Sequence, residues 1–311
     1  MKLAFLIVCH KNPEQINCMI KILSNPDIDF YIHVDKKCEI DQYINSCNSN
    51  VYLLPNEQRI DIKWGTFSQV QATLNLLKYA NKKQYDYYWQ ISGQDFPLVS
   101  AKKIINIINN DNKQKMHNYV NLFISKNNGS KNSTNYDKRN EILFPEWMMK
   151  RNLKYRIIRR LWVSITGGYR HTFRIFVRSS LKEVKFYFGS SWWCISSEFK
   201  KYILNYIKIH PEYIEFFKKT SYPDESFFQT LLMNSEYRNS RVEYLHYIDW
   251  SEGNSSPKTL KCEDLDKMFE SGKLMARKID REIDQKIISE ICQRIQDNDI
   301  LKNHKNGGYN D

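Results

Sequence analysis

The chain contains 311 residues, of which 41% are hydrophobic and 26% are charged, and its 47 Lys and Arg exceed its 35 Asp and Glu to give a formal net charge of +12. This length fits one large domain, or one domain with an appendage, and the apolar fraction excludes a disordered chain. The seven cysteines are odd in number, scattered and without a CxxC pair. We therefore expect no disulfide framework, no zinc knuckle and a reducing cytoplasm as the compartment.

The excess of positive charge has two interpretations. It can serve an anionic partner such as nucleic acid, a membrane surface or a phosphorylated small molecule. It can equally reflect a coding bias toward Lys, Asn and Ile, with the lysines solvated. Composition alone does not choose between them.

The first hundred residues alternate strand and helix patterns. The apolar run Lys2–Cys9 predicts a strand; it is too short to cross a bilayer and no small-residue cleavage site follows, so we expect neither a membrane helix nor a signal peptide. Asn12 and Pro13 predict the cap and start of a helix. Further strands are expected at Ile28–Val34, Val51–Leu54 and Tyr85–Ile91, and helices over Thr66–Ala80 and after a cap at Ser100. This alternation predicts a Rossmann-like layout with parallel strands, although no GxGxxG or Walker A loop is present.

The second half begins with a polar stretch, residues 125–139, that predicts a surface loop. Residues 150–185 follow, with eleven Lys and Arg against one acid, Glu183, and with interleaved aromatic residues. Downstream we expect a buried strand at Ser191–Ser196, a helix at Asp224–Met233, a strand at Val242–Ile248, a short helix at Glu263–Glu270 and a further helix in the tail after Arg281.

Six short motifs occur in order along the chain. They are HVDKK at 33–37, SGQDFPL at 92–98, GSSWWCIS at 189–196, YPDESFFQTLL at 222–232, WSEGNSSPKTL at 250–260 and MARKID at 275–280. Together they resemble the core-2/I-branching β-1,6-N-acetylglucosaminyltransferase family, which also includes peptide O-xylosyltransferases, and a bacterial-type member is expected. The resemblance implies an α/β, GT-A-like, Rossmann-type nucleotide-sugar domain at residues 1–280, with a mixed central sheet flanked by helices. A C-terminal helix and polar tail would occupy residues 281–311.

The family's reaction is inverting transfer from a UDP-sugar to an acceptor hydroxyl, and the resemblance places its general base at Glu225. One carboxylate suffices to take the acceptor proton while the acceptor oxygen attacks C1 from the face opposite UDP, through an oxocarbenium-like transition state. Pro223-Asp224-Glu225 is also a common first helical turn, favoured by the helix dipole. With the other five motifs in place, Glu225 is the candidate base. Asp224 can orient the site, but capping is the role that the pattern favours for it.

The leaving diphosphate carries charge that must be neutralised. By motif, two lysines, Lys258 and Lys278, take the place of a metal in this family, and Arg277 can share their work. Some members carry Arg at the first position, and Lys lacks the bidentate fork of Arg. The loop that would hold a DxD metal motif has a single carboxylate, Asp95, and we interpret the remaining DxD strings, Asp27/Asp29, Asp264/Asp266 and Asp297/Asp299, as solvated charge. No metal or cofactor is expected.

The resemblance places the nucleoside at the carboxyl ends of the first strands. Ile7 falls where the family's backbone contacts uracil, Asp35 matches the Asp that holds the nucleoside, and Trp64 falls where an aromatic residue lies beside it. Trp64 fits a core position equally well. His10 and His33, which lie beside this region, are interpreted as structural hydrogen-bonding residues.

Contacts to the two sugars follow from two further motifs. Gly189, Ser190 and Trp193 resemble the segment that lines the sugar pocket. Trp250 and Glu252 lie in the segment that carries acceptor contacts in the family. Because neighbours in a strand point to opposite faces, one of the two tryptophans at 192 and 193 is expected in the core.

The basic aromatic stretch 150–185 has three interpretations. It can contact an anionic membrane surface that presents a lipid-linked glycan acceptor, bind an anionic glycan, or form a solvated helix face. No RRM, KH or helix-turn-helix signature supports nucleic acid as a partner.

The function expected from these motifs is transfer of GlcNAc from UDP-GlcNAc in the synthesis of surface polysaccharide or lipid-linked oligosaccharide. The enzyme would be cytoplasmic, or peripheral at the inner face of the plasma membrane. A UDP-xylose-dependent β-xylosyltransferase and a non-catalytic nucleotide-sugar or glycan-binding protein are the alternatives.

Overall fold

A mixed sheet forms the centre of the molecule. The computed structural model describes residues 1–46, 49–113, 115–123, 139–143, 145–149, 152–168, 181–254 and 256–306. Within them, seven strands lie in the order β3-β2-β1-β4-β7-β6-β8. Their bounds are β1 Leu3–Cys9, β2 Ile28–Val34, β3 Val51–Leu53, β4 Tyr87–Ser92, β6 Asn118–Val120, β7 Trp193–Ser196 and β8 Arg241–Val242.

The first four strands pair in parallel, β1 with β2 and β4, and β2 with β3, whereas β7 runs antiparallel to both β4 and β6. The predicted α/β fold class, with a mixed central sheet flanked by helices, is therefore confirmed. A second sheet has the order β5-β10-β9, formed by Asp95–Pro97, Met275–Arg277 and His246–Ile248.

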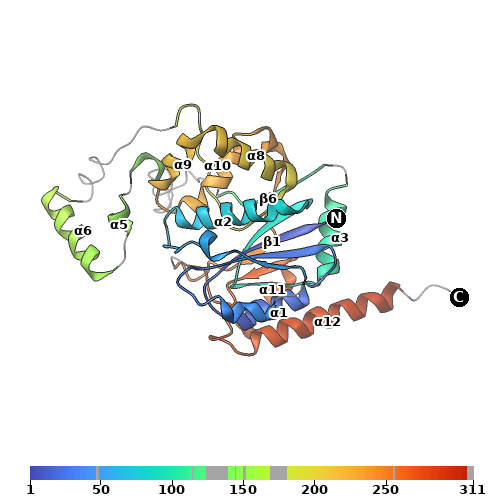
Figure 1. Ribbon diagram of the computed structural model, residues 1–311. Helices are drawn as coiled ribbons and strands as arrows, with labels where there is room; N and C mark the ends of the chain where they lie inside the picture. Colours follow the sequence, from blue (N-terminus) through green and yellow to red (C-terminus); the bar gives the residue numbers. More distant parts are fainter. Residues whose placement is uncertain are drawn as a thin grey trace.

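Helices cover both faces of the main sheet (Figure 1). Those above it in Figure 1 are α2 Ser68–Tyr79, α8 Ser197–Ile209, α9 Pro211–Lys218 and α10 Phe227–Met233; those below it are α1 Pro13–Ile22, α11 Leu265–Glu270 and α12 Ile287–Asn306. Helix α3, Ala101–Asp111, packs its apolar residues on the same core as α1, and α5 Glu146–Met149 and α6 Leu153–Ile165 lie at the outer edge of the molecule. No helix among the described residues is both long and apolar enough to cross a bilayer.

The alternation of side chains along β1 explains the two cores. Leu3, Phe5 and Ile7 point into the core shared with α1, α3 and α12, and Ala4 and Leu6 point into the core shared with α2, α8, α9 and α10. A parallel strand covered on both faces reads as a continuous apolar run, which is the pattern seen in the sequence.

The C-terminal helix contributes to the first of these cores. Ile287, Ile291 and Ile295 of α12 are buried there at helical spacing. The division of the chain at residue 280 stays a prediction.

Two expected elements differ from the structure. The expected strand Val242–Ile248 is two strands, β8 and β9, which belong to different sheets. The expected helix Asp224–Met233 is a 3-10 turn, Pro223–Glu225, followed by α10. The turn ends there because the carbonyl of Glu225 accepts a hydrogen bond from the Gly189 amide at 2.8 Å.

Asn12 and Ser100 were expected to cap helices. Neither side chain makes a hydrogen bond that caps its helix. Asn12 adopts a left-handed backbone conformation, with φ 54°, and its side-chain amide donates instead to Asp280 at 2.9 Å. The expected loop at 125–139 falls, apart from Arg139, outside the described residues.

Candidate active site

A cleft of about 570 Å³ opens where the parallel strands end. Its wall includes His10 just after β1, Asp35 just after β2, and Ser92 and Gln94 at the end of β4. The carboxyl ends of parallel strands gather at one edge of a sheet, and this edge is the usual ligand site of open α/β folds. The predicted position of the nucleoside therefore coincides with a real cleft.

Glu225 lies in this cleft at the end of the 3-10 turn, and its Oε2 accepts a hydrogen bond from Nη1 of Arg139 at 2.5 Å. Burial raises the pKa of Glu225 to about 7, and the negative charge of Asp224 adds to this rise, whereas Arg139 opposes it. A carboxyl group that titrates near neutral pH is suited to accept a proton from a substrate hydroxyl.

Asp224 also lies in the cleft wall, and its carboxyl group has a different hydrogen-bond partner from that of Glu225. Its Oδ2 accepts a hydrogen bond from the Ser191 hydroxyl at 2.6 Å, and burial raises its pKa above the usual range of an aspartate. The two carboxyl groups are adjacent in sequence and each raises the cost of charging the other.

Four cationic side chains line the cleft. The Nη1 of Arg277 donates to Ser92 at 2.6 Å and to Asp95 at 2.7 Å, and its guanidinium lies 4.2 Å from the ring centroid of Trp192. Lys11 pairs with Asp280 at 2.5 Å. Lys37 pairs with Asp35 and Asp61. The side-chain ammonium of Lys278 makes no hydrogen bond or ion pair with any other described residue, although its backbone carbonyl accepts a hydrogen bond from the Leu260 amide at 2.9 Å.

The charges of these cations act on one another and on His10. Burial lowers the pKa of Lys278, and the charges of Arg277 and Lys11 lower it further. Burial likewise lowers the pKa of His10, with Lys11 the next cause. A bound anion would relieve both effects, because it favours the charged form of each group.

Of the eleven predicted site residues, six line the cleft: Asp35, Trp64, Ser190, Glu225, Trp250 and Lys278. Trp64 is 43% exposed and meets the ring of Tyr222 edge-on at 4.7 Å, so it is a wall residue and not a core residue. Trp250 is half exposed.

The other five predicted residues do not line the cleft. Ile7 is fully buried in β1, although its neighbour Val8 reaches the wall. Trp193 is buried in the core, where its ring packs 5.0 Å from that of Phe228, and Trp192 faces the cleft in its place. One of the two tryptophans was expected in the core, and it is Trp193, whereas Trp192 is the cleft residue.

Lys258, Gly189 and Glu252 are each engaged elsewhere. The Lys258 ammonium pairs with Asp264 at 2.6 Å, although Ser256 and Pro257 just before it reach the cleft wall. Gly189 has no room for a side chain, because a Cβ there would lie 1.9 Å from the carbonyl oxygen of Asn121. Glu252 is exposed and accepts a hydrogen bond from the side chain of Asn254.

Among the described residues, no group of three or more His, Cys, Asp or Glu is arranged to hold a metal ion. Two of the DxD strings are tied into ion pairs. Asp29 binds Lys83, and in the second string Asp264 binds Lys258 and Asp266 binds Arg294.

Comparison with known proteins identifies the family. Residues 3–270 match the family model described as Core-2/I-Branching enzyme. The chain belongs to the Core-2/I-branching enzyme family. The resemblance carried by the six motifs, and with it membership of a glycosyltransferase family, is confirmed.

The curated relatives of this Core-2/I-branching chain are distant. Human xylosyltransferase 1 is 22% identical over 94% of this chain and 30% of its own length. Human beta-1,3-galactosyl-O-glycosyl-glycoprotein beta-1,6-N-acetylglucosaminyltransferase is 25% identical over 74% of this chain and 48% of its own. Xylosyltransferase oxt of Drosophila pseudoobscura pseudoobscura is 25% identical over 80% and 26%. The chain thus spans less than half the length of each of these relatives.

Sequence reasoning missed the partners that hold the site. Arg139 is separated from Glu225 by 86 residues and lies in a region where the family's motifs give no alignment. Asp280 accepts hydrogen bonds from Lys11, Asn12 and Gln94, and so joins the MARKID motif to the ends of β1 and β4. Asp280 and Asp95 both lie inside motifs that the sequence analysis singled out. Their place in those motifs was the sequence signal that could have marked them as site residues.

Proposed function

We propose that this Core-2/I-branching chain is an inverting glycosyltransferase that moves a sugar from a UDP-sugar to a glycan hydroxyl. The observation that carries the proposal is the placement of Glu225, whose pKa is raised to about 7, in one cleft with the cations Arg277 and Lys278. The reaction requires a group that accepts a proton and a site that binds the anionic diphosphate. Here the residues for these two roles come from different segments of the chain.

In the proposed step, the acceptor oxygen forms a bond to C1 of the donor sugar as the bond from C1 to the diphosphate oxygen breaks. The bonding electron pair leaves with UDP, and the acceptor proton passes to the carboxylate of Glu225. Arg139 holds that carboxylate from one side. An attack from the face opposite the diphosphate inverts the configuration at C1.

Charge on the departing UDP would be stabilised by fixed cations and not by a metal. Lys278 and Arg277 are the candidates on the cleft wall, and the pairing of Arg277 with Asp95 and Ser92 holds its guanidinium in place before substrate arrives. Asp35 and Trp64 would hold the nucleoside. Lys258 remains a candidate through the family resemblance, with its ammonium released from Asp264.

For the donor we propose UDP-GlcNAc, with UDP-xylose as the second candidate. Relatives named as β-1,6-N-acetylglucosaminyltransferases and as xylosyltransferases support one candidate each. For the acceptor we propose a glycan, free or lipid-linked, in surface polysaccharide or lipid-linked oligosaccharide synthesis. The enzyme would be a cytoplasmic, bacterial-type member with peripheral contact to the inner face of the plasma membrane through residues 150–185.

The decisive experiment compares consumption of UDP-GlcNAc and UDP-xylose by the full chain and by Glu225→Gln. We expect a loss of roughly 10²–10⁴-fold in turnover for Glu225→Gln, with UDP affinity retained. Glu215→Gln is the matched control, because Glu215 of α9 is exposed, pairs with Lys218 outside the cleft wall, and should leave turnover unchanged.

Two results would contradict the proposal. If Glu225→Gln kept full turnover, the general base would be another group, and if neither nucleotide sugar were consumed while UDP still bound, the chain would be a binding protein. Activity is expected to persist in EDTA. Loss of activity in EDTA with recovery on adding Mn²⁺ would overturn the metal-free part of the mechanism.

A further inference from the structure

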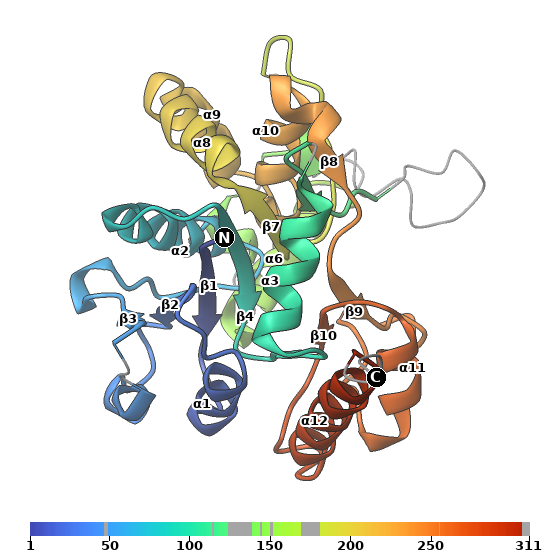
Figure 2. The same ribbon diagram turned by 90° about the vertical axis from the view of Figure 1, so that its right-hand side faces the viewer.

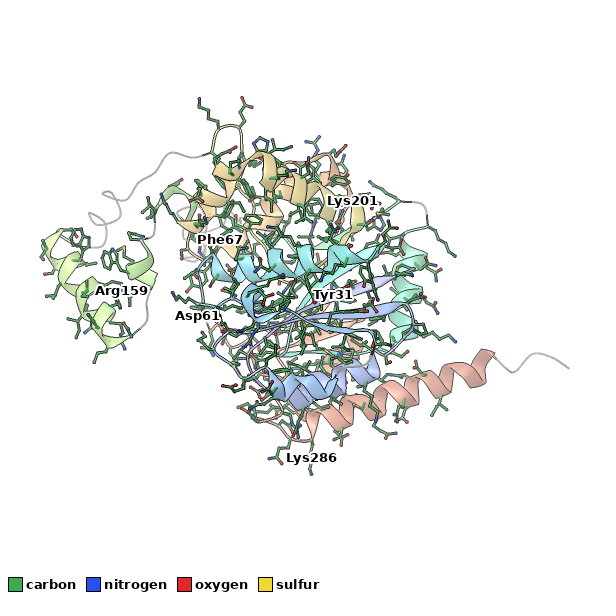
Figure 3. The ribbon with its side chains drawn as sticks, in the orientation of Figure 1. Tyr31, Asp61, Phe67, Arg159, Lys201 and Lys286 are labelled. Atoms are coloured by element: carbon green, nitrogen blue, oxygen red, sulfur yellow. The ribbon has the colours of Figure 1, made fainter. Side chains whose placement is uncertain are left out.

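Helix α6, the described core of the basic aromatic stretch, turns only one narrow stripe toward the protein. Within α6 only Val163 is buried, and only Tyr155 and Arg159, at preceding four-residue steps, are partly buried. Arg159 donates to the carbonyl of Met148 at 2.5 Å, and Trp162 meets the ring of Trp147 edge-on. Figure 3 shows Arg159 between α6 and α5. These contacts fix which side of the helix faces outward.

The outward side of α6 is apolar. Five aliphatic side chains lie there with exposed fractions between 37% and 80%: Leu153, Ile157, Ile158, Leu161 and Ile165. Four of them, spaced four residues apart, share one face of the helix. A surface helix of a soluble protein normally turns such a face toward the core, so an exposed apolar face indicates a partner.

Basic side chains border and interrupt this apolar face, and α6 contains no acidic residue. Lys154, Arg156 and Arg160 are exposed beside the aliphatic residues. Long basic side chains can place their alkyl stems on an apolar surface while the charged ends reach outward. An apolar face bordered by Lys and Arg is the pattern of a helix that lies in the interface of an anionic bilayer.

The position of α6 agrees with this pattern. In Figure 1, β1 runs from the N-terminus toward the side on which α6 lies. Figure 2, viewed from the right-hand side of Figure 1, places α6 behind the centre of the sheet. The cleft opens at the carboxyl ends of these same strands. A surface in contact with α6 would therefore lie on the cleft side of the molecule.

We propose that α6 is an interfacial helix that docks the enzyme on an anionic lipid bilayer. Leu153, Ile157, Leu161 and Ile165 enter the boundary between headgroups and acyl chains, and Lys154 and the exposed arginines contact lipid phosphates. This docking specifies the peripheral membrane contact of the proposed function. Its biological role rests on that proposed function, because docking would bring the cleft toward an acceptor carried by a lipid. The docking itself requires no sugar transfer.

Charge complementarity favours the bilayer over a second copy of the chain. Two α6 helices packed face to face would bring their basic borders together without an acidic residue from either helix, in a protein of net charge +12. An anionic lipid surface offers the opposite charge together with an apolar interior.

The test is sedimentation of the full chain with vesicles of phosphatidylcholine alone and with vesicles containing equal parts of phosphatidylcholine and phosphatidylglycerol. We expect binding to the anionic vesicles only. The double variant Ile157→Glu/Leu161→Glu should weaken this binding by at least about tenfold. Ile209→Glu, at an exposed isoleucine that ends α8, is the apolar control and should bind as the parent chain does.

Charge is tested separately. Changing Lys154, Arg156 and Arg160 together to Gln should cost roughly 100-fold in binding to anionic vesicles, about fivefold for each residue. The same change at three exposed lysines outside α6, Lys102, Lys201 and Lys208, should cost much less. Equal losses in the two triple variants would show that net charge alone governs binding, and would overturn the assignment to α6.

Folding and catalysis provide the remaining controls. All variants should keep the thermal melting profile and the solution rate of UDP-sugar hydrolysis of the parent chain, because α6 supplies no cleft residue. Unchanged vesicle binding by the α6 variants would overturn the inference, as would conversion of a dimer to a monomer by the double variant without loss of vesicle binding. Vesicle binding by a chain that neither binds UDP nor consumes a UDP-sugar would reject the proposed function and leave the docking helix in place.

Discussion

Arg139 and Glu225 show how one contact at the residue scale controls the proposed chemistry. A general base acts only as the carboxylate, so kcat/KM should rise with pH through about 7, where burial has placed the pKa of Glu225. The guanidinium of Arg139, at 2.5 Å, stabilises the carboxylate and so lowers that pKa. Removing it should therefore move the acidic limb of the profile to higher pH.

The variant Arg139→Gln tests this effect. We expect kcat/KM to fall several-fold below neutral pH and to recover in alkaline solution, because the carboxylate then forms without help from the arginine. The control is Arg294→Gln, which breaks an arginine–carboxylate pair with Asp266 outside the cleft and should leave the profile unmoved. A uniform loss of activity at every pH would instead assign Arg139 to substrate binding.

The two lysines assigned by motif are expected to differ in their roles. Lys278 has no ion-pair partner among the described residues and lines the cleft, so Lys278→Met should weaken UDP binding by about 10–100-fold, measured by calorimetry. Lys258 pairs with the buried Asp264, so Lys258→Met should lower the unfolding midpoint more than it changes UDP affinity. If both variants lost UDP affinity equally, Lys258 would turn to the nucleotide on binding.

At the scale of the element, continuous patterns were predicted well and interrupted ones were not. The strand expected at Ile28–Val34 has the same bounds as β2, because β-branched and aromatic residues occupy most of its positions and both of its faces are largely buried. The run Val242–Ile248 looks equally strand-like, yet its two ends pair in different sheets. Local propensity carries no information about which sheet edge a residue meets.

The site was predicted to the level of the segment and not to the level of the side chain. The motifs found the wall that contains Glu225, Asp35 and Lys278. They did not resolve which of Trp192 and Trp193 faces inward, because that depends on how β7 packs on α10. Nor did they find Arg139, because its contact with Glu225 arises only from the folding of the chain between them.

At the scale of the whole molecule, the sheet that holds the cleft depends on the last helix. Ile291 of α12 is fully buried in the core that also contains Phe5 and Ile7 of β1, whereas Ile300 on the same helix is more than half exposed. Truncating a buried isoleucine removes apolar contacts and leaves a cavity, so Ile291→Ala should cost roughly 2–5 kcal/mol of unfolding free energy in urea titration. Ile300→Ala should stay within about 0.5 kcal/mol of the parent chain. Equal small effects would mean that α12 frays from the sheet in solution and that the strand ends carrying the cleft are held without it.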